Sequence, residues 1–323
     1  MEILDLRLLR PRDLEPLLEE EKQLWRSRLQ WDYSNTAAWI LRFMETRALA
    51  GYAAVEQGRP VGYSFFVYED YKGLIGGFFV SGEFRNGETE SRLVTHVIET
   101  LQATPGIGRI EAQFIHFSSE PVRQCFLSQD FQSYGRKFLY FRLADGLPLP
   151  VSNDSGVDLL SWKPRWFSEA AQLITRAYRG HVDSQISDQY RTRAGAMRFL
   201  ENMIHHAGCG VFQENCSFLA FRKGGGLPCG MVLTSVVQDR VAHVTQLCVD
   251  PEFQGGGIGP RLMAQVLKTL RERGFEAATL TVTASNTRAL RLYEKLRFSN
   301  LTDFDAFAWD VEPERDLPPG RNL

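Results

Sequence analysis

The sequence has no surplus of either charge and no long apolar run. Its 323 residues carry 37 lysines and arginines against 39 aspartates and glutamates, a formal net charge of −2, so no global positive field attracts nucleic acid or an anionic membrane. No window reaches the ~18 apolar residues of a membrane span. The N-terminus carries Glu2, Asp5 and Asp13, where a signal peptide is basic and then apolar. We expect no nucleic-acid or membrane partner and a cytoplasmic location.

Cysteines are few and are not spaced in pairs. The chain has five of them and no C-x-x-C motif, which argues against a disulfide framework and against a four-cysteine zinc site. The nearest approach to a metal-binding group is His205, His206, Cys209 and Cys216, whose spacing matches no common zinc site. We therefore predict no metal.

The composition is that of a folded protein of two domains. Apolar residues make up 44% and charged residues 24%, both ordinary for globular chains, and the length favours two domains over one. Turn-forming residues dominate 144–155, and apolar residues are few after 311. We predict a first domain at 1–143, a linker at 144–155, a second domain at 156–311 and a flexible tail at 312–323.

Hydrophobic periodicity predicts the same order of elements in both halves. In the second half we expect helices at 165–178, 194–206, 260–273 and 287–296, and strands at 216–222, 229–238, 240–249, 277–283 and 304–311. In the first half we expect helices at 12–28, 36–47, 90–102 and 120–127, and strands at 52–56, 60–68, 74–80, 109–117 and 137–143. Each half is therefore predicted to be a mixed α/β unit.

Two residue pairs indicate an internal duplication. Phe131 and Phe298 each follow a short expected helix and are 167 residues apart, while Arg85 and Gln254 are 169 residues apart. Because the two offsets agree within two residues, the second half is predicted to repeat the first.

A glycine-rich loop is the most informative segment for chemistry. It lies between an expected strand and a helix that Pro260 opens, and its residues are Gln254, Gly255, Gly256, Gly257, Ile258 and Gly259. Glycines let backbone N–H groups converge on an anion, and a helix N-terminus adds about half a positive charge. The loop therefore predicts a phosphate or pyrophosphate site.

The absence of other phosphate-binding motifs narrows the choice of ligand. The ATP-binding pattern GxxxxGK[ST] is missing, and the dinucleotide pattern GxGxxG fails from Gly255 and from Gly257. The pattern that remains, Gln/Arg-x-x-Gly-x-Gly/Ala, resembles the coenzyme A loop of the GNAT acetyltransferases. A second segment, from Asn286 to Phe298, resembles that family's N-x-x-A-x-x-L-Y-x-x-x-G-F motif, with Arg297 where glycine is usual.

This resemblance, which covers 156–311, implies a fold and a reaction. The fold is α/β (α+β), with two tandem GNAT-like domains, each a mixed, mostly antiparallel sheet flanked by helices. The reaction is direct transfer of the acetyl group of acetyl-CoA, the cosubstrate, to a primary amine by an N-acetyltransferase. The partners are then acetyl-CoA and an amine acceptor, and the chain is a monomer or homodimer. The alternatives are a non-catalytic acyl-CoA sensor or scaffold and, more distantly, a dinucleotide-binding oxidoreductase.

The resemblance also implies residue roles. Tyr293 is the general acid for the leaving thiolate, because a phenol is protonated at neutral pH; the alternative is a packed aromatic. Asn286 reaches the cofactor arm or only caps its helix. Backbone groups of Leu247, Cys248 and Val249 pair with the pantetheine arm, and we expect the Cys248 thiol to pack rather than react.

The general base is the least defined role. In this family it comes from one of several strand positions, which His243, Gln246 and Thr281 occupy here. His243 is the candidate, because an imidazole with a pKa near 6.5 accepts a proton at neutral pH. The alternatives are a structural histidine and a water relay.

The first half lacks the residues that carry this chemistry. Aligned on the same offsets, Glu88 and Glu90 replace Gly257 and Gly259, Ser119 stands where the second half has its asparagine, and a phenylalanine replaces the tyrosine. Carboxylates repel a pyrophosphate. The first domain is therefore predicted to be a degenerate, non-catalytic copy that completes the interface and shapes the substrate cleft.

The acceptor is expected at 181–191, between the two opening helices of the second half. The candidates to meet a cationic amine are His181, Asp183, Asp188 and Tyr190, and the alternative is a solvated loop. The sequence does not choose among a small amine, an amino acid, a protein N-terminus and a lysine side chain.

Overall fold

The computed structural model describes residues 1–116, 119–146, 156–206 and 210–311. Most of the predicted linker, the whole predicted tail and Cys209 lie outside these residues. The helices are α1 (Pro11–Leu29), α2 (Ser34–Glu45), α3 (Glu88–Ala103), α4 (Glu120–Ser128), α5 (Phe167–Ala177), α6 (Asp183–Ile186), α7 (Arg193–His205), α8 (Ile258–Glu272) and α9 (Thr287–Lys295).

The strands form one mixed sheet. They are β1 (Glu2–Asp5), β2 (Ala50–Glu56), β3 (Arg59–Glu69), β4 (Lys72–Val80), β5 (Arg109–Gln113), β6 (Gln132–Arg142), β7 (Val157–Ser161), β8 (Val211–Phe212), β9 (Phe218–Arg222), β10 (Pro228–Gln238), β11 (Val241–Val249), β12 (Ala277–Thr283) and β13 (Ser299–Asp310). Their order is β1-β2-β3-β4-β5-β13-β6-β12-β11-β10-β9-β7, with β8 beside β10. Among the described strands, only the pairs β4–β5 and β11–β12 are parallel.

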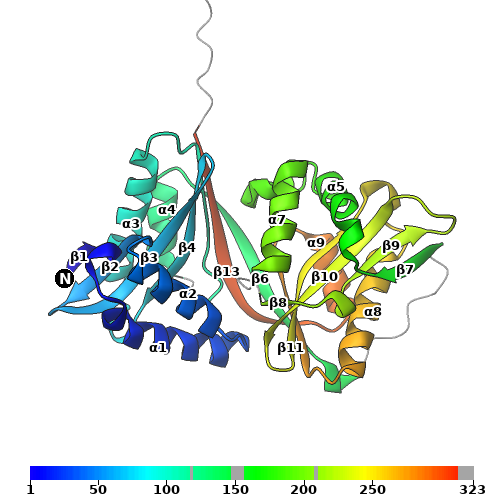
Figure 1. Ribbon diagram of the computed structural model, residues 1–323, viewed down its shortest axis with the longest axis horizontal. Helices are drawn as coiled ribbons and strands as arrows, with labels where there is room; N and C mark the ends of the chain where they lie inside the picture. Colours follow the sequence, from blue (N-terminus) through cyan, green and yellow to red (C-terminus); the bar gives the residue numbers. More distant parts are fainter. Residues whose placement is uncertain (117–118, 147–155, 207–209, 312–323) are drawn as a thin grey trace, which may run out of the picture.

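The two halves exchange their last strands. β13, from the end of the second half, pairs with β5 of the first half, and β6, from the end of the first half, pairs with β12 of the second. β6 and β13 also pair with each other, and Figure 1 shows them side by side at the centre of the molecule. The strand order therefore reads as a pseudo-twofold repeat about the β6–β13 pair, as the internal duplication predicts.

Helices cover both faces of the sheet in each half (Figure 1). In β10, Met231 and Leu233 pack with α5 and α7, whereas Val232 packs with α8, as expected for side chains that alternate along a strand. The first half repeats the arrangement, with α1 and α2 in one core and α3 and α4 in another. The predicted fold, a mixed sheet flanked by helices in each half, is confirmed.

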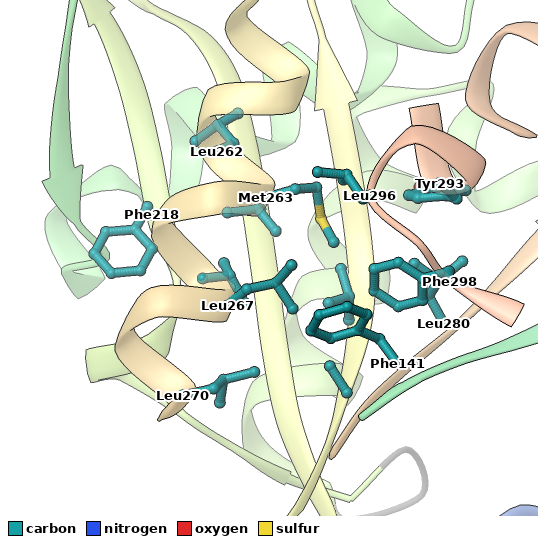
Figure 2. Packing of buried hydrophobic residues seen from close by; sticks show 14 of the residues in the cluster. Phe141, Phe218, Leu262, Met263, Leu267, Leu270, Leu280, Tyr293, Leu296 and Phe298 are labelled. Carbon is teal, nitrogen blue, oxygen red and sulfur yellow. The ribbon is translucent and has the colours of Figure 1, made fainter. Parts of the chain in front are cut away.

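The exchange of strands carries side chains from one half into the core of the other. Leu139, Phe141 and Leu143 of the first half are buried among residues of α8, β12 and α9. Figure 2 shows Phe141 beside Phe298, and their ring centroids are 5.3 Å apart. Burial of these apolar side chains couples the stability of the two halves.

The predicted elements agree with the structure except at a few ends. β13 begins at Ser299, five residues earlier than predicted. The reason is that its polar first residues, Ser299 and Asn300, pair with Tyr140 and Leu139 of β6. β5 ends at Gln113 instead of continuing, because its pairing with β4 stops at Ala112 and its pairing with β13 stops at Gln113. The short strands β1, β7 and β8, the short helix α6 and the first five residues of β6 were not expected from the sequence.

Candidate active site

The glycine-rich loop leaves the N-terminus of α8 open. Gly257 caps α8 with φ +76°, and Gly255 has φ +90°, conformations that residues with a Cβ rarely adopt. Among the described residues, no heavy atom lies within 4 Å of a Cβ built on either glycine. The N–H groups of the first turn of α8, and its dipole, are therefore accessible to an anion.

A groove of about 730 Å³ runs over this loop. Except for Gly256, all the predicted cofactor-binding residues line it, and so do the basic side chains of Arg288, Arg291 and Lys295. Arg288 donates a hydrogen bond to the side chain of Gln254. The groove thus offers hydrogen-bond donors and positive charge to a ligand that carries phosphate groups.

β11 and β12 separate beside the groove. Their parallel pairing ends at Val244 and Leu280, and Thr245 forms a bulge against β10. Beyond the bulge, the side of β11 that faced β12 has no neighbouring strand among the described residues, so backbone groups from Leu247 onward are available to an extended ligand. Cys248 lies here with its thiol buried, and burial raises its pKa to about 12. The thiol is therefore protonated, as expected for a packing role.

A second space of about 330 Å³, here called the acceptor cavity, adjoins the groove. The residues that line both spaces are Tyr178, Leu247, Asn286 and Ala289. Molecules bound in the groove and in the acceptor cavity would therefore meet at these four residues.

Tyr293 lines the acceptor cavity from α9 and is buried. Burial, with a smaller effect of the Asp183 carboxylate, raises the pKa of its phenol above the ordinary value, so the hydroxyl keeps its proton at neutral pH. Asn286 caps α9 by accepting from the Ala289 N–H over 3.1 Å, and its amide nitrogen lies 3.2 Å from His181 Nε2. Asn286 therefore caps its helix and also lines the junction of the two spaces.

The predicted acceptor segment folds over the cavity as α6 and a 3-10 turn. Asp183 lines the cavity and accepts a hydrogen bond from the hydroxyl of Thr283, at the end of β12. Tyr190 lines it too and stacks on Tyr178, with ring centroids 4.5 Å apart. His181 lines the groove instead. The structure thus brings Asp183 and Tyr190, but not His181, to the acceptor cavity.

The first half holds this segment in place, and Asp188 serves that purpose. Its carboxylate accepts hydrogen bonds from Lys72 Nζ and Tyr71 Oη, each over 2.6 Å. Arg109 of β5, fully buried, donates to the backbone oxygen of Gln185 over 2.6 Å. The prediction that Asp188 meets the amine is therefore wrong, because its carboxylate is committed to the first half.

His243 lies on β11 among aromatic rings. Its Nδ1 is 2.8 Å from Thr279 Oγ1, and the rings of Trp31 and Phe138 flank it. Burial, with a smaller contribution from Arg136, lowers its pKa to about 3. An imidazole with so low a pKa is neutral but weakly basic, so these surroundings favour a structural role, and the role of base stays a prediction.

In the first half, the N-terminus of α3 corresponds to the N-terminus of α8. Gly87 caps α3 with φ +82°, much as Gly257 caps α8. Because these two glycines are equivalent, Glu88 and Glu90 each fall one position beyond the loop glycine that they were expected to replace. That prediction is wrong by one residue.

At the N-terminus of α3, side-chain oxygens of the first half nevertheless accept the hydrogen bonds that an anion would accept. The Asn86 side chain accepts hydrogen bonds from the N–H groups of Glu88 and Thr89, both over 3.0 Å. The Glu90 carboxylate accepts from the Gly87 N–H over 2.7 Å. The donors that remain open at α8 are therefore already satisfied at α3.

Part of the second half matches a known protein family. The sequence profile described as "Acetyltransferase (GNAT) family" matches residues 182–298, which contain the loop, α8 and α9. The chain carries a GNAT-family domain. A mycothiol acetyltransferase of Streptosporangium roseum is 43% identical over 72 residues, which are 22% of this chain and 19% of that protein. The chain thus spans about a fifth of the length of this curated relative.

Two solved structures extend the likeness to the whole GNAT-like fold. A GCN5-related N-acetyltransferase from Sphaerobacter thermophilus has a TM-score of 0.69 and 17% identity over 98% of both chains. A tandem GNAT protein from the clavulanic acid biosynthesis pathway has a TM-score of 0.60 and 14% identity over 97% of this chain and 99% of its own. Identities this low show the fold alone. Since both structures match nearly the whole chain and one is a tandem GNAT protein, the predicted tandem arrangement of the fold is confirmed.

Sequence reasoning missed several residues that line the acceptor cavity. Tyr178 ends the helix before the acceptor segment, so an aromatic residue at that place was an available signal. The first half contributes Trp31, Gln113, Ile115 and Arg136, for which the sequence holds no local signal. They reach the cavity only because the halves pack together.

The described residues contain neither a metal-binding cluster nor a membrane-spanning helix. No group of three or more His, Cys, Asp or Glu side chains is arranged to hold a metal ion there. No helix in the described part of the chain is long and apolar enough to cross a membrane.

Proposed function

We propose that this protein is an N-acetyltransferase that moves the acetyl group of acetyl-CoA directly to a primary amine. The observation that carries the proposal is the junction of the groove and the acceptor cavity. The open N-terminus of α8 lies at the groove, and the protonated phenol of Tyr293 lies in the cavity. An amine in the cavity and a thioester in the groove would thus meet beside a proton donor.

The chemistry balances with the residues present. The amine nitrogen attacks the thioester carbonyl carbon, the carbon–sulfur bond breaks, and the amine loses one proton while the thiolate gains one. Tyr293 supplies the proton to sulfur, and backbone N–H groups of β11 polarise the thioester carbonyl. The amine proton leaves through water, the alternative to His243, because burial lowers the pKa of that imidazole to about 3.

The first half takes part by shaping the cavity and holding the acceptor segment. It binds no cofactor of its own, because Asn86 and Glu90 already satisfy the donors of α3. The location in the cytoplasm and the monomeric or dimeric state stay predictions.

Titration calorimetry with acetyl-CoA tests the cofactor site. Gly259 lies in the first turn of α8 with room for a Cβ at ordinary contact distance. Gly259→Glu adds a carboxylate beside the phosphates and should weaken binding at least about a hundredfold, since juxtaposed like charges cost several kcal/mol. The matched control Gly259→Ala adds the carbon without the charge and should bind.

We expect one acetyl-CoA site per chain, and thiol release once an amine is supplied. Two sites would contradict the role given to the first half. Binding without thiol release from any amine would favour the acyl-CoA sensor, and no binding would refute the proposal.

A further inference from the structure

The acceptor cavity contains a positive and a negative side chain placed along one strand. Arg136 reaches it from β6 and donates from Nη2 to the Thr281 hydroxyl over 3.3 Å. Asp183 reaches it from α6 and accepts from the Thr283 hydroxyl. Because Thr281 and Thr283 are two residues apart on β12, they share a face and lie about 7 Å apart. The guanidinium and the carboxylate are therefore held at two neighbouring points of one wall.

Two buried nitrogen donors of residues that line the acceptor cavity have no acceptor within the described part of the chain. The Nε of Arg136 and the Nε2 of Gln246 are both buried, and neither makes a hydrogen bond within the described residues. Gln246 is only 5% exposed and lines the acceptor cavity. Within the described residues no carboxylate forms an ion pair with Arg136 either. Buried donors of this kind are costly unless a partner satisfies them.

The missing partner must be an acceptor with negative charge. A guanidinium binds a carboxylate with two parallel hydrogen bonds, and such charge-assisted bonds are about twice as strong as neutral ones. Asp183, a short distance along the strand, suits a cationic amine before it loses its proton. A cavity of about 330 Å³ has room for one small molecule carrying both groups.

We infer that the acceptor is a small zwitterion, an amine that also carries a carboxylate. Its amine faces Asp183 and the thioester, and its carboxylate faces Arg136 and Gln246. This inference rests on the proposed function and narrows it to amino-acid-like acceptors. A protein N-terminus or a lysine side chain of a polypeptide would place a neutral peptide group at the guanidinium.

A matched set of amines tests the inference. Acetyl-CoA consumption is followed with L-amino acids, with their α-amides and with the amines left by decarboxylation, all at equal concentration. We expect kcat/KM for the best amino acid to exceed that of its amide and its decarboxylated amine at least about tenfold.

Substitution of the guanidinium identifies its role. Arg136→Gln should raise KM for the best amino acid about tenfold or more, with the affinity for acetyl-CoA and the kcat/KM of the decarboxylated amine unchanged. Arg142→Gln is the control, since Arg142 is an exposed arginine of the same strand, and it should change none of these values.

The outcomes separate the two claims. The zwitterion inference would be overturned if decarboxylated amines were turned over as well as the amino acids, or if Arg136→Gln lowered kcat/KM equally for all acceptors. Either result would leave the proposed acetyltransferase activity intact. One bound acetyl-CoA per chain without turnover of any amine would refute the proposed function itself, and this inference with it.

Discussion

The N-termini of α3 and α8 both follow a glycine with positive φ, but only at α3 do side chains accept hydrogen bonds from the first N–H groups. Each helix is capped by a glycine in the left-handed region. At α3 the first N–H groups are bound by Asn86 and Glu90, whereas at α8 no side chain of the described residues caps the helix. An anion site can therefore be lost without loss of the fold, when side chains of the same chain accept hydrogen bonds from the N–H donors.

The largest expected effect comes from exchanging the equivalent residues of α9 and α4. Tyr293→Phe should lower kcat by about 10²–10⁴ and leave acetyl-CoA affinity unchanged, because only the proton donor is removed. Phe126 is the buried residue of α4 that corresponds to Tyr293 in the alignment of the two halves. The matched change Phe126→Tyr should give no second active centre. Steady-state kinetics and calorimetry measure both, and an unchanged kcat in Tyr293→Phe would remove this residue from the mechanism.

A smaller effect should follow when the first half loses its hold on the acceptor segment. Asp188→Asn removes the charge that Lys72 and Tyr71 contact, so we expect unfolding free energy to fall by about 1.5–3 kcal/mol and KM for the acceptor to rise. Acetyl-CoA affinity should stay constant.

Glu19→Gln, which breaks an exposed pair with Lys22, is the control for Asp188→Asn and should cost under about 1 kcal/mol. If KM is the same in both variants, the first half does not position the acceptor.

Each half also buries a neutral imidazole, and this makes both sensitive to acid. Burial lowers the pKa of His116 and of His243 to about 3, below the value near 6.5 in the unfolded chain. The stability that each provides is therefore complete above pH 6.5 and is lost as pH falls toward 3, with a slope of up to about 1.4 kcal/mol per pH unit. Below pH 6.5 the denaturant midpoints of His116→Gln and His243→Gln should each fall less steeply with decreasing pH than the midpoint of the unsubstituted protein. An unchanged pH dependence would show that the imidazole is not buried in its neutral form.

The smallest effect is expected at the cap of α3. Glu90→Ala removes the carboxylate that accepts from the Gly87 N–H and should cost about 1 kcal/mol of unfolding free energy. Because Asn86 still binds two of the N–H groups, no acetyl-CoA should bind there. A second site detected by calorimetry in this variant would show that Glu90 alone keeps the first half inactive.

The sequence predicted those features that depend on neighbours in the chain. The loop at Gly257, the helix at Asn286 and the strand that ends at Val249 all follow from local turn chemistry and periodicity, and they were found where expected. Arg136 and Trp31 were missed because their place in the cavity depends on packing between halves. The exchange of β6 and β13 was missed for a related reason, since the pattern of a strand does not say which neighbour it pairs with.

The exchanged strands have a consequence for synthesis of the protein. β5 is complete at Gln113, but its partner β13 begins only at Ser299, so the ribosome adds nearly two hundred residues between them. At about 5–20 residues per second, one edge of β5 waits about 10–40 s for its native neighbour. During that time the emerging first half exposes a strand edge on which a chaperone or a second nascent chain can act.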